Sequence, residues 1–99
     1  MNQDDLTVKI FKALGHPVRL KIMKFLCEGP KCVCKLNEEF EYSQANLSQH
    51  LRILKDATLV KGEKIGLEMH YRIYNDKIRN IICNVEDYVE DLVVNIKNS

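Results

Sequence analysis

The spacing of apolar residues changes from a helical to a strand period late in the chain, and this change constrains the fold most. Residues 67–74 alternate apolar and polar side chains, which is the pattern of a half-buried strand. Residues 59–63 supply a partner strand, and 64–66 supply a hairpin tip in which Gly66 takes the position of positive φ. Helical spacing marks the other segments, which are 4–14, 17–27, 32–40, 44–57 and 76–97. The sequence therefore predicts a mainly α fold of about five helices with a small two-stranded β-hairpin.

Local signals mark the ends of these helices within one predicted domain that covers residues 1–99. Gly15 is suited to end the first helix, and Pro17 is suited to the first position of the second. Ser43 is a good N-cap for the helix that begins at residue 44. A chain of 99 residues fits a single domain, and a second subunit would add to its limited buried surface.

The order of the predicted elements is that of a winged helix-turn-helix, with the helix-turn-helix at about 32–57 and the wing at about 59–74. The second helix of such a pair enters the major groove of DNA, where its exposed face contacts base edges and phosphates. Lys61 and Lys64 on the wing would reach nearby phosphates. The alternative is an ordinary solvated helix face. The helix residues expected to contact DNA are Gln44, Asn46, Ser48, Gln49 and Arg52.

The last predicted helix carries a long apolar seam, which predicts a second copy of the chain as its partner. Its seam consists of Ile78, Ile82, Val85, Val89, Leu92 and Ile96. A terminal helix this apolar on so small a chain favours packing on another chain over folding back on its own core. We expect a homodimer formed through the helices at about 4–14 and 76–97. Residues 43–64 hold four basic and two acidic side chains, whereas 76–99 hold three basic and five acidic ones, which fits a middle that faces DNA.

Four cysteines occur in a chain that has no secretory signal and no apolar run long enough to cross a bilayer. We therefore expect a cytoplasmic protein without membrane contact, in which structural disulfides are disfavoured. Cys27, Cys32 and Cys34 lie within eight residues, and such clustering favours metal or redox chemistry. The chain has no phosphate-binding glycine loop and no metalloprotease motif, so it is predicted not to be an enzyme and to carry no constitutive cofactor.

Three segments resemble motifs of the arsenical-resistance repressor (ArsR) family. Residues 12–22, which read Lys-Ala-Leu-Gly-His-Pro-Val-Arg-Leu-Lys-Ile, are similar to its opening motif. Residues 43–54, which read Ser-Gln-Ala-Asn-Leu-Ser-Gln-His-Leu-Arg-Ile-Leu, are similar to its recognition helix, and residues 70–73 to its second wing strand. The colinear match over about residues 10–75 implies a homodimeric winged-helix repressor. Such a protein binds inverted-repeat operator DNA and releases it when an inducer binds.

Two positions depart from the pattern of that family. Thr58 stands where the family usually has glycine, so we expect the recognition helix to end differently. Leu67 stands where the wing tip often carries an arginine, so we expect a weaker phosphate contact from the wing. Neither departure changes the predicted fold.

The segment Cys32-Val33-Cys34 resembles the Cys-Val-Cys signature of the metalloid- and heavy-metal-sensing branch of the family. The resemblance implies that these two thiols hold the inducer, and thiolates are soft ligands suited to As(III), Sb(III), Cd(II), Pb(II) or Zn(II). Residues two apart point to different sides of an ideal helix. We therefore expect an ion held by both thiols to distort the first turn of the helix at 32–40 and so to shift the recognition helix.

A third thiolate would complete a trigonal site, and Cys27 is the candidate. Asn37 stands where some arsenic sensors of the family have a further cysteine, and Gly29-Pro30 would allow Cys27 to fold back. The zinc- and nickel-sensing branch uses Asp and His ligands on the last helix. Residues 76–97 contain no histidine, so that site is not expected here.

A redox or persulfide sensor is the alternative function. One branch of the family senses oxidants with one cysteine late in the second helix and one in the last helix, and Cys27 and Cys83 stand in similar places. Cys83 lies away from the apolar seam, where an exposed thiol is available for reaction. The simpler interpretation is that Cys27 is a small buried apolar residue and Cys83 an incidental surface thiol.

Overall fold

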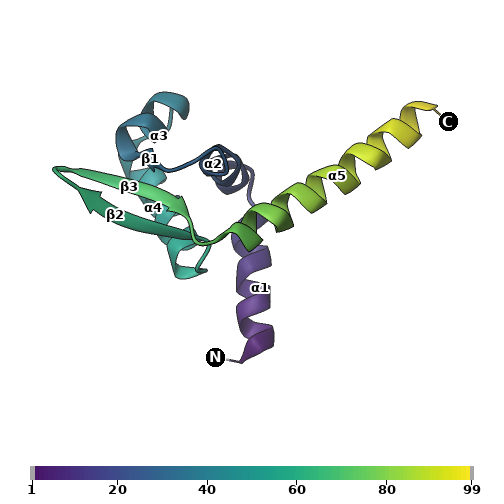
Figure 1. The fold of residues 1–99 in the computed structure, drawn as a ribbon, viewed down its shortest axis with the longest axis horizontal. Coiled ribbons are helices and arrows are strands. Elements are labelled where there is room, and N and C mark those ends of the chain that lie inside the picture. Colours follow the sequence, from purple (N-terminus) through teal and green to yellow (C-terminus); the bar gives the residue numbers. More distant parts are fainter. Residues whose placement is uncertain (1, 99) are drawn as a thin grey trace.

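Five helices and three short strands make up residues 2–98, which the computed structural model describes (Figure 1). The helices are α1 (Gln3–Leu14), α2 (Pro17–Leu26), α3 (Val33–Glu39), α4 (Gln44–Asp56) and α5 (Asp76–Asn98). The strands are β1 (Lys31–Cys32), β2 (Val60–Ile65) and β3 (Glu68–Ile73). All five predicted helices and both predicted wing strands are present, so the prediction of a mainly α fold with a small hairpin is confirmed.

Side chains cap the helices at the places where the sequence predicts helix starts. The Ser43 Oγ accepts a hydrogen bond from the Asn46 backbone N–H at 3.2 Å, as expected of the N-cap of α4. Pro17 occupies the first turn of α2. At the start of α1, the Asn2 Oδ1 accepts from the Asp5 N–H at 2.8 Å and the Asp5 carboxylate accepts in return from Asn2, which forms a capping box.

The sheet has three antiparallel strands in the order β1-β3-β2, one more than the sequence predicts. Strand β1 has only two residues, Lys31 and Cys32, which pair with Tyr71 and His70 of β3. So short a strand leaves no period in the sequence, which is why it was not predicted. The hairpin also extends further than expected, because β2 runs to Ile65. The predicted positive φ of the tip glycine is confirmed, with Gly66 at φ +63°.

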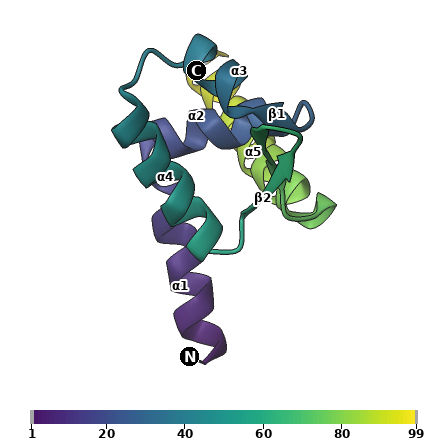
Figure 2. The ribbon, with the colours of Figure 1, turned by 90° about the vertical axis from the view of Figure 1, so that its left-hand side faces the viewer.

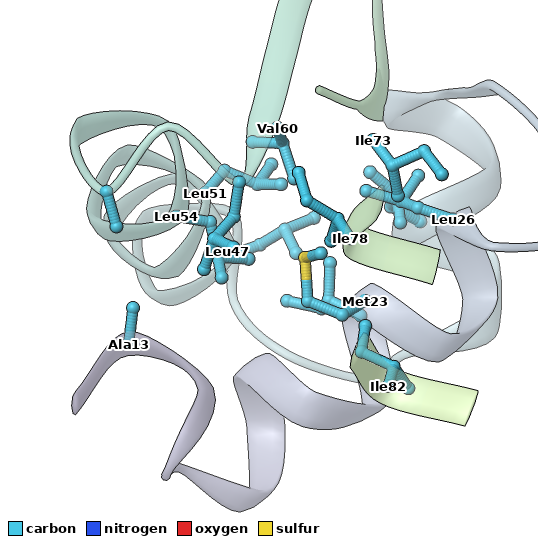
Figure 3. Close-up of a cluster of buried hydrophobic side chains, with 14 residues drawn as sticks. Ala13, Met23, Leu26, Leu47, Leu51, Leu54, Val60, Ile73, Ile78 and Ile82 are labelled. Carbon is cyan, nitrogen blue, oxygen red and sulfur yellow. The ribbon is translucent and has the colours of Figure 1, made fainter. Parts of the chain in front are cut away.

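The hydrophobic core lies where α2 and α4 meet the base of the wing and the first turns of α5 (Figure 3). Leu47, Leu51 and Leu54 of α4 are buried, as their spacing predicts. Shortening a buried leucine to alanine typically costs about 2–5 kcal/mol, so this face fixes the orientation of α4. Its opposite face is left in solvent. The other buried residues of the core are Ala13, Ile22, Met23, Leu26, Leu36, Ala57, Leu59, Val60, Ile73, Ile78 and Ile82.

Helix α4 ends in a left-handed turn although the chain has no glycine there. Thr58 adopts φ +60°, and its N–H donates to the Lys55 carbonyl at 2.9 Å. The Leu59 N–H donates to the Leu54 carbonyl at 3.0 Å. These two bonds form a Schellman motif, in which the buried Leu54 and Leu59 supply the usual apolar contact. The expectation that this helix ends differently from its relatives is therefore wrong in conformation, because Thr58 adopts the geometry that glycine favours.

Helices α1 and α5 extend away from the core, and α5 and the wing project in opposite directions (Figure 1). Seen from the side of α4 and the wing, α5 runs behind the body (Figure 2). The radius of gyration is 14.9 Å, whereas a compact domain of this length has about 13 Å. Many apolar side chains on α1 and α5 are exposed, including Phe11 at 66% and Tyr88 at 64%. None of the helices within residues 2–98 has the length and apolar character that crossing a bilayer requires.

Candidate DNA-reading surface and thiol cluster

The face of α4 opposite the core is polar and exposed. All five of its predicted DNA-contacting residues lie at exposed positions, and within residues 2–98 their side chains form no intramolecular hydrogen bond or ion pair. Their amide, hydroxyl and guanidinium groups are therefore available to an external partner. These residues are Gln44, Asn46, Ser48, Gln49 and Arg52.

The inner edge of α4 is tied to α2 through His50. The His50 Nδ1 lies 3.3 Å from an Arg19 guanidinium nitrogen, and its ring lies 4.8 Å from that of His16. The Arg19 Nε donates in turn to the Ala13 carbonyl at 2.7 Å. Burial lowers the pKa of His50, and the neighbouring His16 and Arg19 lower it further because a proton there would meet like charges. A neutral His50 thus helps to fix α4 against α1 and α2.

The wing presents two lysines in different settings. The Lys61 Nζ lies 4.3 Å from the centre of the Tyr74 ring in a cation–π contact. Lys64 is exposed nearer the tip. The tip itself is apolar, because Leu67 is 97% exposed and Ile65 beside it is 53% exposed. The two lysines therefore lie on one strand, β2, which leads to an apolar tip.

Cys32 and Cys34 lie together at the start of α3, joined by a disulfide with a Cα–Cα distance of 5.2 Å. Cys32 is the N-cap, with extended backbone at φ −72° and ψ 159°, and its Sγ accepts from the Lys35 N–H at 3.2 Å. The two side chains therefore do not follow the spacing of two helical residues. The disulfide therefore forms beside a regular α3, and the expectation that an ion held by both thiols distorts the first turn stays a prediction. The sequence also disfavoured a disulfide, but the close sulfurs form one here.

A carboxylate of the wing approaches the two sulfurs. Within residues 2–98, the only group of three or more candidate ligand atoms lying within 4.8 Å of one another comes from Cys32, Cys34 and Glu68. The Glu68 Oε2 also lies 3.6 Å from the His70 Nε2. Sequence reasoning missed Glu68, because its only signal was a place on the polar side of an alternating strand. Cys27 does not join this group.

Cys27 and Cys83 are free thiols, at the end of α2 and on α5 respectively. Cys27 caps the end of α2, where its carbonyl accepts from the Arg79 Nε at 3.2 Å. Burial raises the pKa of the Cys27 thiol, Arg79 opposes the rise, and the nearby Cys83 and Glu86 add to it. Cys83 is exposed on α5. The structure therefore places the predicted redox pair in one neighbourhood, on α2 and α5.

Known regulators match the chain in sequence. The family model described as "Bacterial regulatory protein, arsR family" matches residues 16–61. An uncharacterized HTH-type transcriptional regulator of Methanocaldococcus jannaschii is 42% identical over 88 residues, which cover 88% of this chain and 99% of that protein. The arsenical resistance operon repressor of Bacillus subtilis is 42% identical over 73 residues, covering 73% of this chain and 70% of the repressor.

A solved structure matches the fold. The winged helix-turn-helix DNA-binding domain of a possible ArsR-family regulator from Mycobacterium bovis, described as homodimeric, superposes with a TM-score of 0.85 at 24% identity. The match covers 90% of this chain and 82% of that domain. The arrangement of helices and wing is therefore the winged helix-turn-helix that the sequence predicts.

Proposed function

The chain belongs to the ArsR family of bacterial regulatory proteins, and from this premise we propose that it is a DNA-binding repressor that releases its operator when a thiophilic ion binds Cys32 and Cys34. The observation that carries the proposal is the meeting of the two sulfurs at the N-terminus of α3. That helix directly precedes the helix whose polar face is exposed. The thiols therefore lie at the start of the helix that is joined by one short connection to α4, the proposed DNA-reading helix.

The exposed face of α4 reads the major groove in this proposal. Gln49 and Ser48 donate to and accept from base edges, and Arg52 binds guanine or phosphate. Gln44 and Asn46 stand at the helix start, where a phosphate also meets the free N–H groups of the first turn. Lys64 on the wing adds a phosphate contact outside the groove.

A homodimer formed through α1 and α5 supplies the second reading helix. The two helices line an apolar groove of about 680 Å³, which includes Phe11, Leu14, Ile81, Val85 and Val89. Exposed apolar surface of this kind marks an interface between chains. A two-fold dimer requires an inverted-repeat operator, and its two reading helices enter half-sites about 34–36 Å apart.

The donor set at the start of α3 fits a soft ion. Two thiolates suit As(III), Sb(III), Cd(II) or Pb(II), and binding requires that the disulfide first be reduced to two thiolates, with a reductant supplying two electrons. The Bacillus subtilis relative carries arsenical resistance in its name, and a Staphylococcus aureus relative carries cadmium resistance in its name. A bound ion supplies a cross-link between Cys32 in the sheet and Cys34 in the helix.

The contacts of α3 transmit a change at the thiols to α4. Leu36 is fully buried in the same hydrophobic core as the apolar face of α4. Phe40, at the C-terminal end of α3, packs edge-on against Phe25 at 5.7 Å and stacks on Tyr42 at 5.9 Å, just before α4 begins. Allosteric coupling is typically about 1–3 kcal/mol, or about 5- to 150-fold in DNA affinity. A small shift of α3 thus suffices for partial release.

The test compares wild type with the Cys32→Ser/Cys34→Ser double variant, both fully reduced. Each is titrated onto a fluorescent DNA duplex selected for binding from random sequences, with and without arsenite or Cd(II). We expect equal DNA affinity without ion and ion-driven release only from wild type. Cys83→Ser serves as the matched thiol control and should respond like wild type. Release that persists in the double variant would rule out these two thiols as the sensor.

A redox switch through Cys27 and Cys83 is a second candidate, favoured by the effect of the nearby Cys83 on the pKa of Cys27. In this case the two thiols form a disulfide and lose two electrons and two protons to a polysulfide, whose S–S bond is cleaved. Polysulfide treatment followed by intact mass and peptide mapping tests it. A Cys27–Cys83 bridge that lowers DNA affinity, and that is absent after Cys27→Ser, supports the candidate. A response to polysulfide that survives Cys27→Ser contradicts it.

A further inference from the structure

The register of the sheet brings one face of the wing strand to the thiols. Cys32 of β1 stands directly opposite His70 of β3, so the two side chains emerge on the same face. Glu68 lies two residues before His70 and therefore on that same face. Cys34, in the first turn of α3, completes the group from the helix side. Three separate elements thus meet at this point.

The donor atoms lie near enough to one another to reach a single ion once the bond between the two sulfurs is reduced. The sulfurs and a Glu68 carboxylate oxygen all lie within 4.8 Å of one another. A tetrahedral Zn(II) with bonds of about 2.3 Å to sulfur and about 2.0–2.2 Å to oxygen separates its ligands by about 3.5–3.8 Å. Reduction of the disulfide lets the sulfurs move apart, and the side chain of Glu68 is exposed at the edge of the group.

We propose that Glu68 is the third protein ligand at Cys32 and Cys34, which makes the site selective for a tetrahedral divalent cation, Cd(II) or Zn(II). The inference rests on the proposed function, because it uses the same two thiols. Two thiolates and one carboxylate are a mixed soft and hard set that suits these ions, with an open fourth position for water. As(III) instead takes thiolates, and Glu68 adds nothing to its binding.

His70 acts as a positioning residue for the proposed ligand. Its Nε2 lies 3.6 Å from the Glu68 carboxylate, while its backbone is held in the ladder opposite Cys32. Outer partners of this kind orient ligating carboxylates. A cation at the site therefore links β1 and α3 to β3, and the wing is held together with the helix that precedes α4.

The experiment titrates Cd(II) into reduced full-length protein and follows the ultraviolet charge-transfer absorption of the thiolate–Cd(II) bond, with a competing chelator to give the affinity. We expect Glu68→Gln to weaken Cd(II) binding by at least about ten- to a hundred-fold, because loss of an outer partner of a ligand alone costs about that much. Glu63→Gln is the matched control. Glu63 stands opposite His70 in the strand register but belongs to β2, so this substitution removes the same charge one strand further from the thiols. It should bind Cd(II) like wild type.

Arsenite provides the internal check that Glu68→Gln leaves the fold and the thiols intact. Intact mass should show the same arsenic adduct in wild type and in Glu68→Gln. Equal Cd(II) affinity for wild type, Glu68→Gln and Glu63→Gln, with loss only in the Cys32→Ser/Cys34→Ser variant, would overturn the role of Glu68 and leave the thiol sensor standing. Absence of any Cd(II) or arsenite binding to wild type would instead overturn both proposals.

Discussion

Replacing Thr58 by glycine should stabilise the protein, although Thr58 lies on the surface and contributes no core contact. The residue adopts φ +60° in the Schellman motif that ends α4. A β-branched side chain is poorly suited to this region, because its Cβ approaches the neighbouring carbonyl oxygen. Glycine has no Cβ and adopts the same conformation without strain.

The size of the effect follows from three contributions. A left-handed conformation costs an L-residue about 1–2 kcal/mol, and a branched residue is at the upper end of that range. Glycine loses the hydrogen bond from the Thr58 Oγ1 to the Ala57 carbonyl, 2.6 Å long in the structure, which is worth about 0.5 kcal/mol at a part-exposed site. The greater conformational freedom of glycine in the unfolded chain lowers the gain in the free energy of unfolding by about a further 0.5 kcal/mol. The net gain in the free energy of unfolding is about 1 kcal/mol.

Thermal unfolding followed by circular dichroism measures this gain. For a domain of this size, about 1 kcal/mol raises Tm by about 4–8 °C. Both proteins are compared at one concentration, because the Tm of an oligomer depends on it. Urea unfolding at 25 °C gives the free energy of unfolding independently. The dependence of this free energy on urea concentration should be the same for both proteins.

Thr58→Ala distinguishes the backbone explanation from a side-chain one. Alanine removes the hydroxyl and the branch but keeps a Cβ in the left-handed region, so most of the strain remains. We expect Thr58→Ala to gain much less than Thr58→Gly. Equal stabilisation by alanine and glycine, or a lower Tm for glycine, would refute the argument from positive φ.

Three further predictions follow from burial and ionisation. The pKa of His50 is lowered below its ordinary value of 6.5, so as pH falls the unfolded chain binds a proton at this histidine before the folded chain does. The free energy of unfolding should therefore decrease as pH falls below about 6.5. Urea unfolding of His50→Gln should show a smaller decrease, and the same decrease as wild type would contradict the role of His50. Iodoacetamide should alkylate the exposed Cys83 before Cys27, whose thiol pKa is raised by burial; peptide mapping of the reduced protein at short times checks the order, and faster labelling of Cys27 would reverse the assignment. Val89→Asp places a charge in the apolar groove beside α1 and should shift the sedimentation mass from dimer to monomer, whereas Asp87→Asn on the same helix should not; a dimeric Val89→Asp would place the interface elsewhere.

Much of the fold could be predicted because periodicity reports burial directly. The stripe of Leu47, Leu51 and Leu54 predicted the buried face of α4, and the structure confirms it. Ser43 predicted the helix start, since its hydroxyl satisfies a free N–H group there. These signals are local, and they predict the structure correctly because the tertiary packing requires the same helix start and the same buried face.

The end of α4 was predicted less well. The sequence showed that Thr58 replaces a usual glycine, and residue identity alone suggested a different end. The structure keeps the left-handed turn, because the bonds from Thr58 and Leu59 to α4 and the burial of Leu59 together outweigh the strain at one residue. Local preference was overridden by the tertiary contacts of the next residue.

The thiol cluster shows the same limit at the candidate site. Sequence spacing identified Cys32 and Cys34, but it assumed that both lie in a helix. It could not place Glu68 beside them, because that contact depends on the two-residue pairing of β1 with β3, which joins positions 38 and 40 residues apart. The pairing of distant segments depends on the topology of the whole chain, so a local sequence pattern does not predict it.

The strand order β1-β3-β2 leaves β2 at the edge of the sheet, six residues long and projecting from the body (Figure 1). An exposed edge invites a strand from another molecule to add to it, and lysine is a common safeguard against this. Lys61 and Lys64, together with Glu63 between them, place charges along this edge. We therefore expect the lysines proposed to contact phosphates to protect the wing edge of the DNA-free protein as well. Replacing both by neutral residues should leave the wing open to edge-to-edge aggregation when no DNA is bound.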